Sequence, residues 1–355
     1  MIKILDLYIG RTIVTTSSLC LVVLVGLSGI LKFVGQLRRV GKGTYEMSDA
    51  LLFTVLSVPR DIEMFFPMAV LLGALIGLGM LASNSELIVM QAGGWSRLQI
   101  TGSVMKTAIP LMLLVMALGE YGAPVAERMA KELRAQELSG GSLITSQRGI
   151  WAKDGDSFIN IGEVVDENTL GQVTIYEFDR KLDLHRIVAA RAAEFKGSVW
   201  QLEDVTFTQF EEDKVTNRHQ PTDFWTSYLT PEKLSVVTVK PEALSLAGLS
   251  DYIAYLENSN QESARYELAF WRKLLQPATV AVMMLLALSF VFGPLRSVTM
   301  GARILMGIVA GFTFYICEQV FGPITLVYQI PPVIGAILPA TLFTGIAVFL
   351  LRRKH

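Results

Sequence analysis

The stretch from Ile30 to Gly43 carries four cations and no acid. The cations are Lys32, Arg38, Arg39 and Lys42, and the first acid after them is Glu46. Such a cluster can bind phosphate, because each charge-assisted hydrogen bond to a phosphate oxygen contributes roughly 1.5–3 kcal/mol. The alternative is that Lys32 extends its ammonium to lipid headgroups and that the other three cations are solvated.

Further cations flank the next two apolar runs, where acids accompany them. Only the first cluster is clearly unbalanced in charge, because Asp61, Glu63, Glu127 and Glu132 stand among the later cations. An amphiphile whose phosphates lie near the outer leaflet would suit this geometry. The complete set of candidate phosphate ligands is Lys32, Arg38, Arg39, Lys42, Arg60, Lys131 and Arg134.

Residues for catalysis are not grouped in this sequence. The three histidines, His185, His219 and His355, are scattered over turn-like segments and the tail, and we expect each to be a solvated surface residue. Gly41-Lys42-Gly43 lacks the spacing and the hydroxyl of a phosphate-binding loop. The sequence therefore predicts a chain that is not an enzyme and that binds no cofactor or metal of its own.

The composition predicts a membrane protein. The chain has 355 residues, of which 52% are hydrophobic and only 18% charged, and its near-neutral net charge argues against nucleic acid as a partner. A bilayer core about 30 Å thick requires roughly 20 apolar residues of helix. Six stretches qualify, the first of them a retained span and not a cleaved signal: Ile13–Leu31, Met64–Leu81, Val104–Tyr121, Leu274–Phe292, Ala302–Gly322 and Pro332–Leu351.

The distribution of cations predicts the orientation. With six spans, both termini share one side, and the short loops and tails there hold nine cations against four on the other side. We therefore expect both termini in the cytoplasm. The nine are Lys3, Arg11, Arg97, Lys106, Arg296, Arg303, Arg352, Arg353 and Lys354, and the four are the cluster that begins at Lys32.

The section between the third and fourth spans has the alternation and the β-branched and aromatic residues of an antiparallel β domain, as a sandwich, jelly roll or open barrel. Expected strands are 149–153, 157–161, 173–178, 189–195 and 199–207, and residues 251–271 look helical. The predicted organisation is residues 1–124 with three spans, 125–264 as the inserted periplasmic domain, and 265–355 with three more spans.

A short cytoplasmic helix is predicted between spans two and three, at about residues 83–94. Ser83 and Glu86 fit a capping box, and Gly93-Gly94 supplies a stop. So short and apolar a helix must pack on something, either on its own spans or lipid, or on another protein. The charged segment 59–63, before the second span, is predicted to be an interfacial turn.

Two further features leave alternatives open. Spans two and five each hold a pair of glycines four residues apart, Gly73 with Gly77 and Gly307 with Gly311, which suits packing inside the chain or against a partner. Glu120 and Glu318 are the only acids within spans that could couple transport to ions, and rim carboxylates that are paired or exposed to water are the alternative.

Several long segments resemble the LptF/LptG (YjgP/YjgQ) permease family over the whole chain. The segments are Leu7–Thr12, Leu27–Val34, Phe65–Met68, Ser85–Gly94, Gly140–Leu143, Phe292–Ser297 and Phe321–Tyr328. The resemblance implies a multi-pass inner-membrane subunit of an ABC transporter for lipopolysaccharide. It also implies pairing with the related LptF, an LptB ATPase dimer that holds ATP and magnesium, LptC as acceptor, and periplasmic β-jellyroll domains.

The resemblance also implies roles for named residues. Lys32 matches a basic residue at the end of span one, and the helix after span two would be the coupling helix, with Glu86, Leu87, Met90 and Gly93 at the ATPase. Spans one and five would form lateral gates, lined by Val25, Leu27, Ile30, Met306, Phe314 and Cys317. Two rival readings remain, an ion-coupled transporter and a non-transporting scaffold for the periplasmic domain.

Overall fold

The chain folds into two compact units, which we describe separately. The computed structural model describes residues 4–139, 144–154, 157–165, 168–179, 183–211, 214–227, 229–231, 241–259, 261–292 and 299–352. The first unit comprises residues 1–34, 55–127 and 264–355, and the second comprises residues 35–54 and 128–263. Segments 140–143 and 293–297, and the residues Lys3, Arg296, Arg353, Lys354 and His355, lie outside the described residues.

Six helices of the described chain are long and apolar enough to cross a membrane, as predicted. Most extend beyond the predicted spans, because their polar ends are helical too. They are α1 (Ile4–Leu37), α3 (Val58–Ser83), α5 (Arg97–Ala117) with its continuation η1 (Leu118–Gly122) and α6 (Ala123–Ser139), α9 (Ala264–Phe292), α10 (Met300–Val327) and α11 (Pro332–Arg352).

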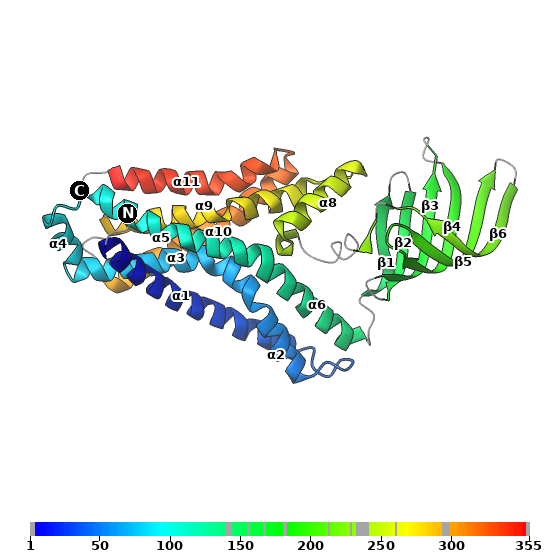
Figure 1. The fold of residues 1–355 in the computed structure, drawn as a ribbon, viewed down its shortest axis with the longest axis horizontal. Helices are drawn as coiled ribbons and strands as arrows, with labels where there is room; N and C mark the ends of the chain where they lie inside the picture. The colour runs from blue at the N-terminus through cyan, green and yellow to red at the C-terminus, as the bar shows by residue number, and fades with distance from the viewer. Residues whose placement is uncertain are drawn as a thin grey trace. The chain divides into compact units, whose positions relative to one another are not determined.

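The spans differ strongly in how much of their surface the chain itself covers. Of the most apolar stretch of each helix, 61% of residues are buried in α3 and 56% in α9, but only 17% in α1 and in α10. Helices α5 and α11 pack on α9, and α10 packs on α3 and α11 (Figure 1). The first unit therefore has a central pair, α3 and α9, and two peripheral helices, α1 and α10.

Both glycine pairs pack inside the chain. A Cβ at Gly73 or Gly77 would meet Ser17, Thr16 or Thr12 of α1, and the Thr16 hydroxyl donates to the Gly73 carbonyl at 2.6 Å. A Cβ at Gly307 or Gly311 would meet leucine and methionine side chains of α3. The glycines therefore let α1 and α10 approach α3 closely.

The inserted antiparallel β domain is confirmed. Its described strands form one six-stranded sheet in sequential order, β1 (Ile144–Asp154), β2 (Ser157–Val164), β3 (Thr169–Phe178), β4 (Leu184–Phe195), β5 (Trp200–Glu211) and β6 (Lys214–Trp225) (Figure 1). Ile161, Val173, Ala190 and Val205 lie in register across β2 to β5, and all four are buried. The alternation found in the sequence thus builds one apolar face.

Strand β6 is not among the predicted strands, and the predicted helix over 251–271 is wrong in its continuity. Most side chains of β6 are exposed, so this edge strand has little apolar alternation to reveal it. The helical segment ends with α8 (Leu246–Asn258) before α9 begins. Tyr255 of α8 donates to the Lys153 carbonyl at 2.7 Å, and burial raises the pKa of its phenol to about 12.

Candidate functional site

The rim network of Ser28, Lys32, Arg60, Asp61, Glu63 and Lys273 joins three helices of the first unit. The Lys32 ammonium on α1 lies 2.6 Å from an Asp61 carboxylate oxygen on α3. The Ser28 hydroxyl, one turn before Lys32, donates to the other Asp61 oxygen at 3.1 Å. The Asp61 side chain is only 4% exposed and that of Lys32 is 33% exposed, so the acid lies behind a cation that reaches the surface.

The second half of the rim network centres on Glu63. Its carboxylate accepts from Arg60 at 2.9 Å and lies 3.5 Å from the Lys273 ammonium of α9. The Lys273 and Glu63 side chains are 7% and 4% exposed, whereas that of Arg60 is 24% exposed. The buried acid therefore has one buried cation and one that is partly open to solvent.

The helical conformation of residues 59–63 explains how these acids are placed. The prediction of an interfacial turn is wrong, because α3 already begins at Val58 with Pro59 in its first turn. Proline suits that position, where no backbone N–H is required, and acids near a helix N-terminus are favourable. The sequence predicts a turn because the charged side chains of this segment are costly within a bilayer. Pairing of the two acids with Lys32, Arg60 and Lys273 lowers that cost, so the segment can be part of the helix.

The loop cations Arg38, Arg39 and Lys42 belong to the second unit. Arg38 and Lys42 are exposed and Arg39 is half-buried, and none of the three has a carboxylate partner within the residues that the structure describes. The loop requires glycine at position 43, because Gly43 has φ +59° and a Cβ there would lie 2.6 Å from the Glu137 carbonyl oxygen. Only glycine fits that position without strain.

Tyr45 anchors the same loop. Its side chain is buried, its hydroxyl lies 3.4 Å from the Gln36 amide oxygen, and burial raises the pKa of its phenol. Of the remaining predicted phosphate ligands, Lys131 and Arg134 lie on α6 and are half-buried. The Arg134 guanidinium stacks 4.9 Å from the centroid of the Phe53 ring on α2 (Met47–Leu56).

The short helix after α3 is α4 (Glu86–Ala92), and Gly93 with Gly94 ends it as predicted. The predicted capping box is wrong, since Ser83 is the last residue of α3 and Ser85 precedes α4 with φ +62° and no side-chain cap. The capping box of this region lies instead between Ser96 and Gln99, at the start of α5.

Helix α4 divides into a buried and an exposed face. Leu87 and Met90 pack into the apolar core of the first unit, whereas Ile88 and Val89 are exposed. Leu87 and Met90 were predicted to contact an ATPase, but their side chains are buried within this chain, and Ile88 and Val89 form the exposed face. One face of α4 therefore packs on the spans of its own chain, as the first alternative predicts. The other face is exposed, so packing on another protein is compatible with it.

Glu86 lies at the start of α4 and is bonded on both carboxylate oxygens. The Tyr8 hydroxyl of α1 donates to one oxygen at 2.8 Å, and the Asn84 amide to the other at 3.3 Å. The acid predicted to meet a basic group on a partner thus already has a partner within its own chain.

The residues predicted to line lateral gates are only partly at the surface. Leu27 and Ile30 of α1 and Met306 of α10 are exposed. Val25 and Phe314 are buried, Phe314 in an edge-to-face contact with Phe343 at 5.0 Å, and Cys317 packs against the core. The predicted gate residues are therefore divided between the surface of α1 and α10 and the interior of the first unit.

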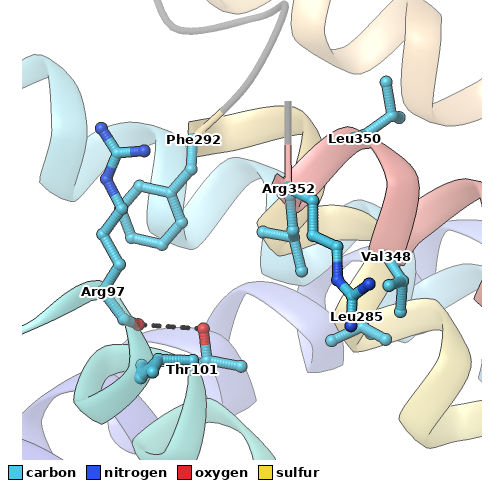
Figure 2. A pocket seen from close by; sticks show the side chains of 9 residues that line it. Arg97, Thr101, Leu285, Phe292, Val348, Leu350 and Arg352 are labelled. Carbon is cyan, nitrogen blue, oxygen red and sulfur yellow. Dashed lines mark hydrogen bonds between the residues drawn. The ribbon is translucent and has the colours of Figure 1, made fainter. Parts of the chain in front are cut away.

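A hollow of about 380 Å³ lies where α5 begins and α9 and α11 end. Figure 2 shows Phe292 beside Arg97 at one side of it, and Leu285 and Val348 beside Arg352 at the other. The Arg97 guanidinium lies 5.9 Å from the centroid of Phe292. None of the predicted phosphate ligands lines this hollow, which separates it from the rim network.

Two members of the rim network, Ser28 and Lys273, are not among the residues predicted from the sequence. Lys273 could have been noticed as a cation at the edge of the fourth span, but its partner on α3 is 210 residues distant in the chain (273 − 63). His185 and His219 are exposed, as predicted. Within the described ranges, no group of three or more His, Cys, Asp or Glu side chains could hold a metal.

Comparisons with known proteins give matches over nearly the whole length of this chain. The family described as lipopolysaccharide export system permease LptF/LptG matches residues 7–353. The chain is 52% identical over 354 residues to the lipopolysaccharide export system permease protein LptG of Escherichia coli (strain K12), covering 99% of this chain and 98% of that protein. It is 47% identical over 357 residues to the LptG of Haemophilus influenzae, covering 100% of both.

Proposed function

The chain belongs to the LptF/LptG family of lipopolysaccharide export system permeases, and from that premise we propose how its residues take up the lipid. It is a multi-pass inner-membrane permease subunit. In our proposal, Lys32 and Arg60 of the rim network bind phosphates of lipopolysaccharide at the outer leaflet, and the apolar spans accept its acyl chains. ATP hydrolysis belongs to a partner.

The observation that carries this proposal is the arrangement of buried acids behind partly exposed cations. A lysine ammonium has three donors, of which the structure uses one toward Asp61, and an arginine guanidinium has five, of which one bonds Glu63. Lys32 and Arg60 can therefore keep their carboxylates and still donate to phosphate oxygens. The acids neutralise the cations while no lipid is bound and hold them in place when it arrives.

The geometry of α3 supports an orientation with the rim network outside. Asp61 lies in the first turn of α3, and α4 follows the other end of this helix, whose 26 residues at 1.5 Å each give a length of about 39 Å. Both termini lie at the end of the first unit that carries α4 (Figure 1). With the excess of cations on that side, we propose that α4 and both termini are cytoplasmic and that the β domain is periplasmic.

The partners follow from the same premise. We propose a heterodimer with LptF, a dimer of the ATPase LptB that contacts Ile88, Val89 and Glu86 of α4, and LptC as acceptor of the lipid. The exposed apolar faces of α1 and α10 support contact with a second permease subunit and lateral entry of lipid. The loop cations, with Lys131 and Arg134, would attract or receive the same phosphates.

The first experiment tests phosphate binding with a matched pair of lysines. Lys106 forms the same kind of pair as Lys32, with the buried Asp6 at 2.8 Å, but near the end that carries the N-terminus. We expect Lys32→Gln to lower photocrosslinking of lipopolysaccharide to a probe at Leu27 about tenfold, and Lys106→Gln to leave it unchanged. Equal crosslinking in both variants, in complexes that assemble normally, contradicts the phosphate site.

A second experiment tests the assembly and the energy source. Affinity purification of this chain from membranes, with identification of bound proteins and lipid, should recover a related permease, an ATPase and lipopolysaccharide. Transport that continues without any ATPase, or that depends on Glu318 or Glu120, would support an ion-coupled transporter instead.

A further inference from the structure

The corner between α3 and α4, residues 79–86, is bonded by one side chain from each of the two peripheral spans. Arg303 reaches it from α10, and Tyr8 reaches it from α1. These two helices are the two spans that the chain covers least, so the corner is linked to both peripheral helices. The two hydrogen bonds therefore lie directly next to α4, in the part of the unit that a displacement of α4 would reach first.

Arg303 is a buried arginine in the first turn of α10. Only 3% of the residue is exposed. Its guanidinium donates to the Gly79 carbonyl at 2.8 Å and to the Ser83 hydroxyl at 3.3 Å, both on the last turn of α3. Buried ionisable side chains in membrane helices are costly, so such a residue is a candidate for a functional role.

The placement of Arg303 does not serve its own helix. A cation is unfavourable near a helix N-terminus and favourable near a C-terminus, where backbone carbonyls lack partners. Arg303 stands at the beginning of α10 but donates to the end of α3. Its charge is therefore arranged to hold α3 to α10.

The Tyr8 bond is the counterpart on α1. Its hydroxyl donates to Glu86, the first residue of α4, at 2.8 Å. Only Asn84 and Ser85 separate α4 from α3, and Ser85 has a left-handed backbone with φ +62°. So short a connection gives α4 little freedom to move without α3.

We infer that the α3–α4 corner transmits movement of α4 to α1 and α10 together, with Tyr8 and Arg303 as the positioning residues. The inference rests on the proposed function, in which a partner ATPase moves α4. It adds the route by which that movement reaches the two helices that face lipid and the second subunit.

The test uses the assembled complex in proteoliposomes and measures lipopolysaccharide released per ATP hydrolysed. We expect Arg303→Gln to lower this ratio about fivefold while ATP hydrolysis continues. Arg303→Lys keeps the charge and a donor for the Gly79 carbonyl, so it should recover most of the ratio. Arg11→Gln, which changes an exposed arginine of α1, is the control and should have no effect.

Tyr8→Phe removes a single hydroxyl and is the milder test of the other bond. We expect it to lower the ratio about twofold, whereas Tyr121→Phe, at an exposed tyrosine of η1, leaves it unchanged. If Arg303→Gln does not assemble, Tyr8→Phe still decides the question, because it retains the packing of the helices and is expected to lower the ratio.

The outcomes separate this inference from the proposed function. If ATP hydrolysis, lipid release and thermal stability fall together at a constant ratio, the residues are merely structural and the inference is overturned. It is also overturned if Arg303→Gln and Tyr8→Phe leave the ratio at the unmodified value. If the unmodified complex releases no lipopolysaccharide on ATP hydrolysis, the proposed function itself fails.

Discussion

The rim network and the loop cations come from one continuous stretch of chain, yet their electrostatic situations are opposite. Lys32 has a carboxylate at 2.6 Å that is almost fully buried. Arg38, Arg39 and Lys42 follow within ten residues and have no carboxylate partner within the described part of the chain. The difference arises because Lys32 is still on α1, beside α3, whereas the others lie in a glycine-containing loop.

This contrast shows that a count of cations does not measure how strongly each can act. A paired cation on a helix is fixed in direction and can contribute a short-range contact, whereas exposed cations act mainly through a field that salt screens. The rim network should therefore determine whether lipid is held, and the loop cations how quickly it arrives. The following variants test that division.

The largest effect is expected for Glu63→Ala. It leaves Lys273 buried without its acid, and breaking a buried pair in this way costs about 3–5 kcal/mol. The thermal stability of the purified complex measures the loss. The double variant Glu63→Ala with Lys273→Met should regain most of it, because the buried ammonium is then removed together with its carboxylate.

A matched control for Glu63→Ala lies on the β domain. Glu194 pairs with Lys196 at 2.5 Å, but both side chains are almost half exposed. Glu194→Ala should therefore change stability by about 0–1 kcal/mol. A similar loss in Glu63→Ala and Glu194→Ala would show that burial does not distinguish the rim network.

The next effect concerns Asp61→Asn, which removes the charge that competes for the Lys32 ammonium. We expect lipopolysaccharide to bind about fivefold more tightly and to be released more slowly, since a donor and a charge become available to phosphate. Binding to the purified complex measures the first change, and release on ATP addition the second. Weaker binding would mean that Asp61 serves to orient Lys32 more than to compete for it.

The matched variant for Asp61→Asn is Asp6→Asn, which changes the equivalent buried acid in the pair with Lys106. It should leave lipid binding unchanged. An equal gain in both variants would assign the effect to general loosening of the helices.

The apolar pattern of the sequence predicted six spans and an inserted β domain, because long apolar runs and strict alternation are local signals. Only part of the rim network could be predicted from the sequence. The sequence marks Lys32 and Arg60 as candidate ligands, but their orientation depends on Asp61 and Glu63, which the sequence pattern places in a turn. Helix formation at Pro59 became clear only with the pairing that α1 and α9 supply.

The start of α4 shows a second limit of local signals. Ser83 and Glu86 have the spacing of a capping box, but Ser83 completes α3 and receives a hydrogen bond from Arg303, 220 residues later. Glu86 in turn bonds Tyr8 of α1. Ser83 and Glu86 thus bond to partners that are distant in the sequence and do not form the local capping box. The neighbouring sequence contains no signal for these distant partners.

A smaller effect is expected when all three loop cations are replaced together by glutamine. Each cation near an anionic surface contributes about 1 kcal/mol at most, and the Debye length is about 8 Å at physiological salt. The rate of lipid crosslinking should fall about threefold at low ionic strength and remain unchanged at high ionic strength. A loss that persists at high salt would place these cations in direct contact with phosphate, as in the rim network.

The smallest effect is expected for Tyr45→Phe, which tests whether the loop cations depend on a fixed loop. The Tyr45 hydroxyl makes one long hydrogen bond of 3.4 Å, so its loss should cost about 0.5 kcal/mol and leave the buried ring in place. Cleavage by trypsin after Lys42 should become about twofold faster, because local opening sets that rate, and Tyr121→Phe should not change it. If Tyr45→Phe also slows lipid crosslinking at low salt, the loop holds its cations in a defined geometry. Their effect would then not be only long-range electrostatic attraction.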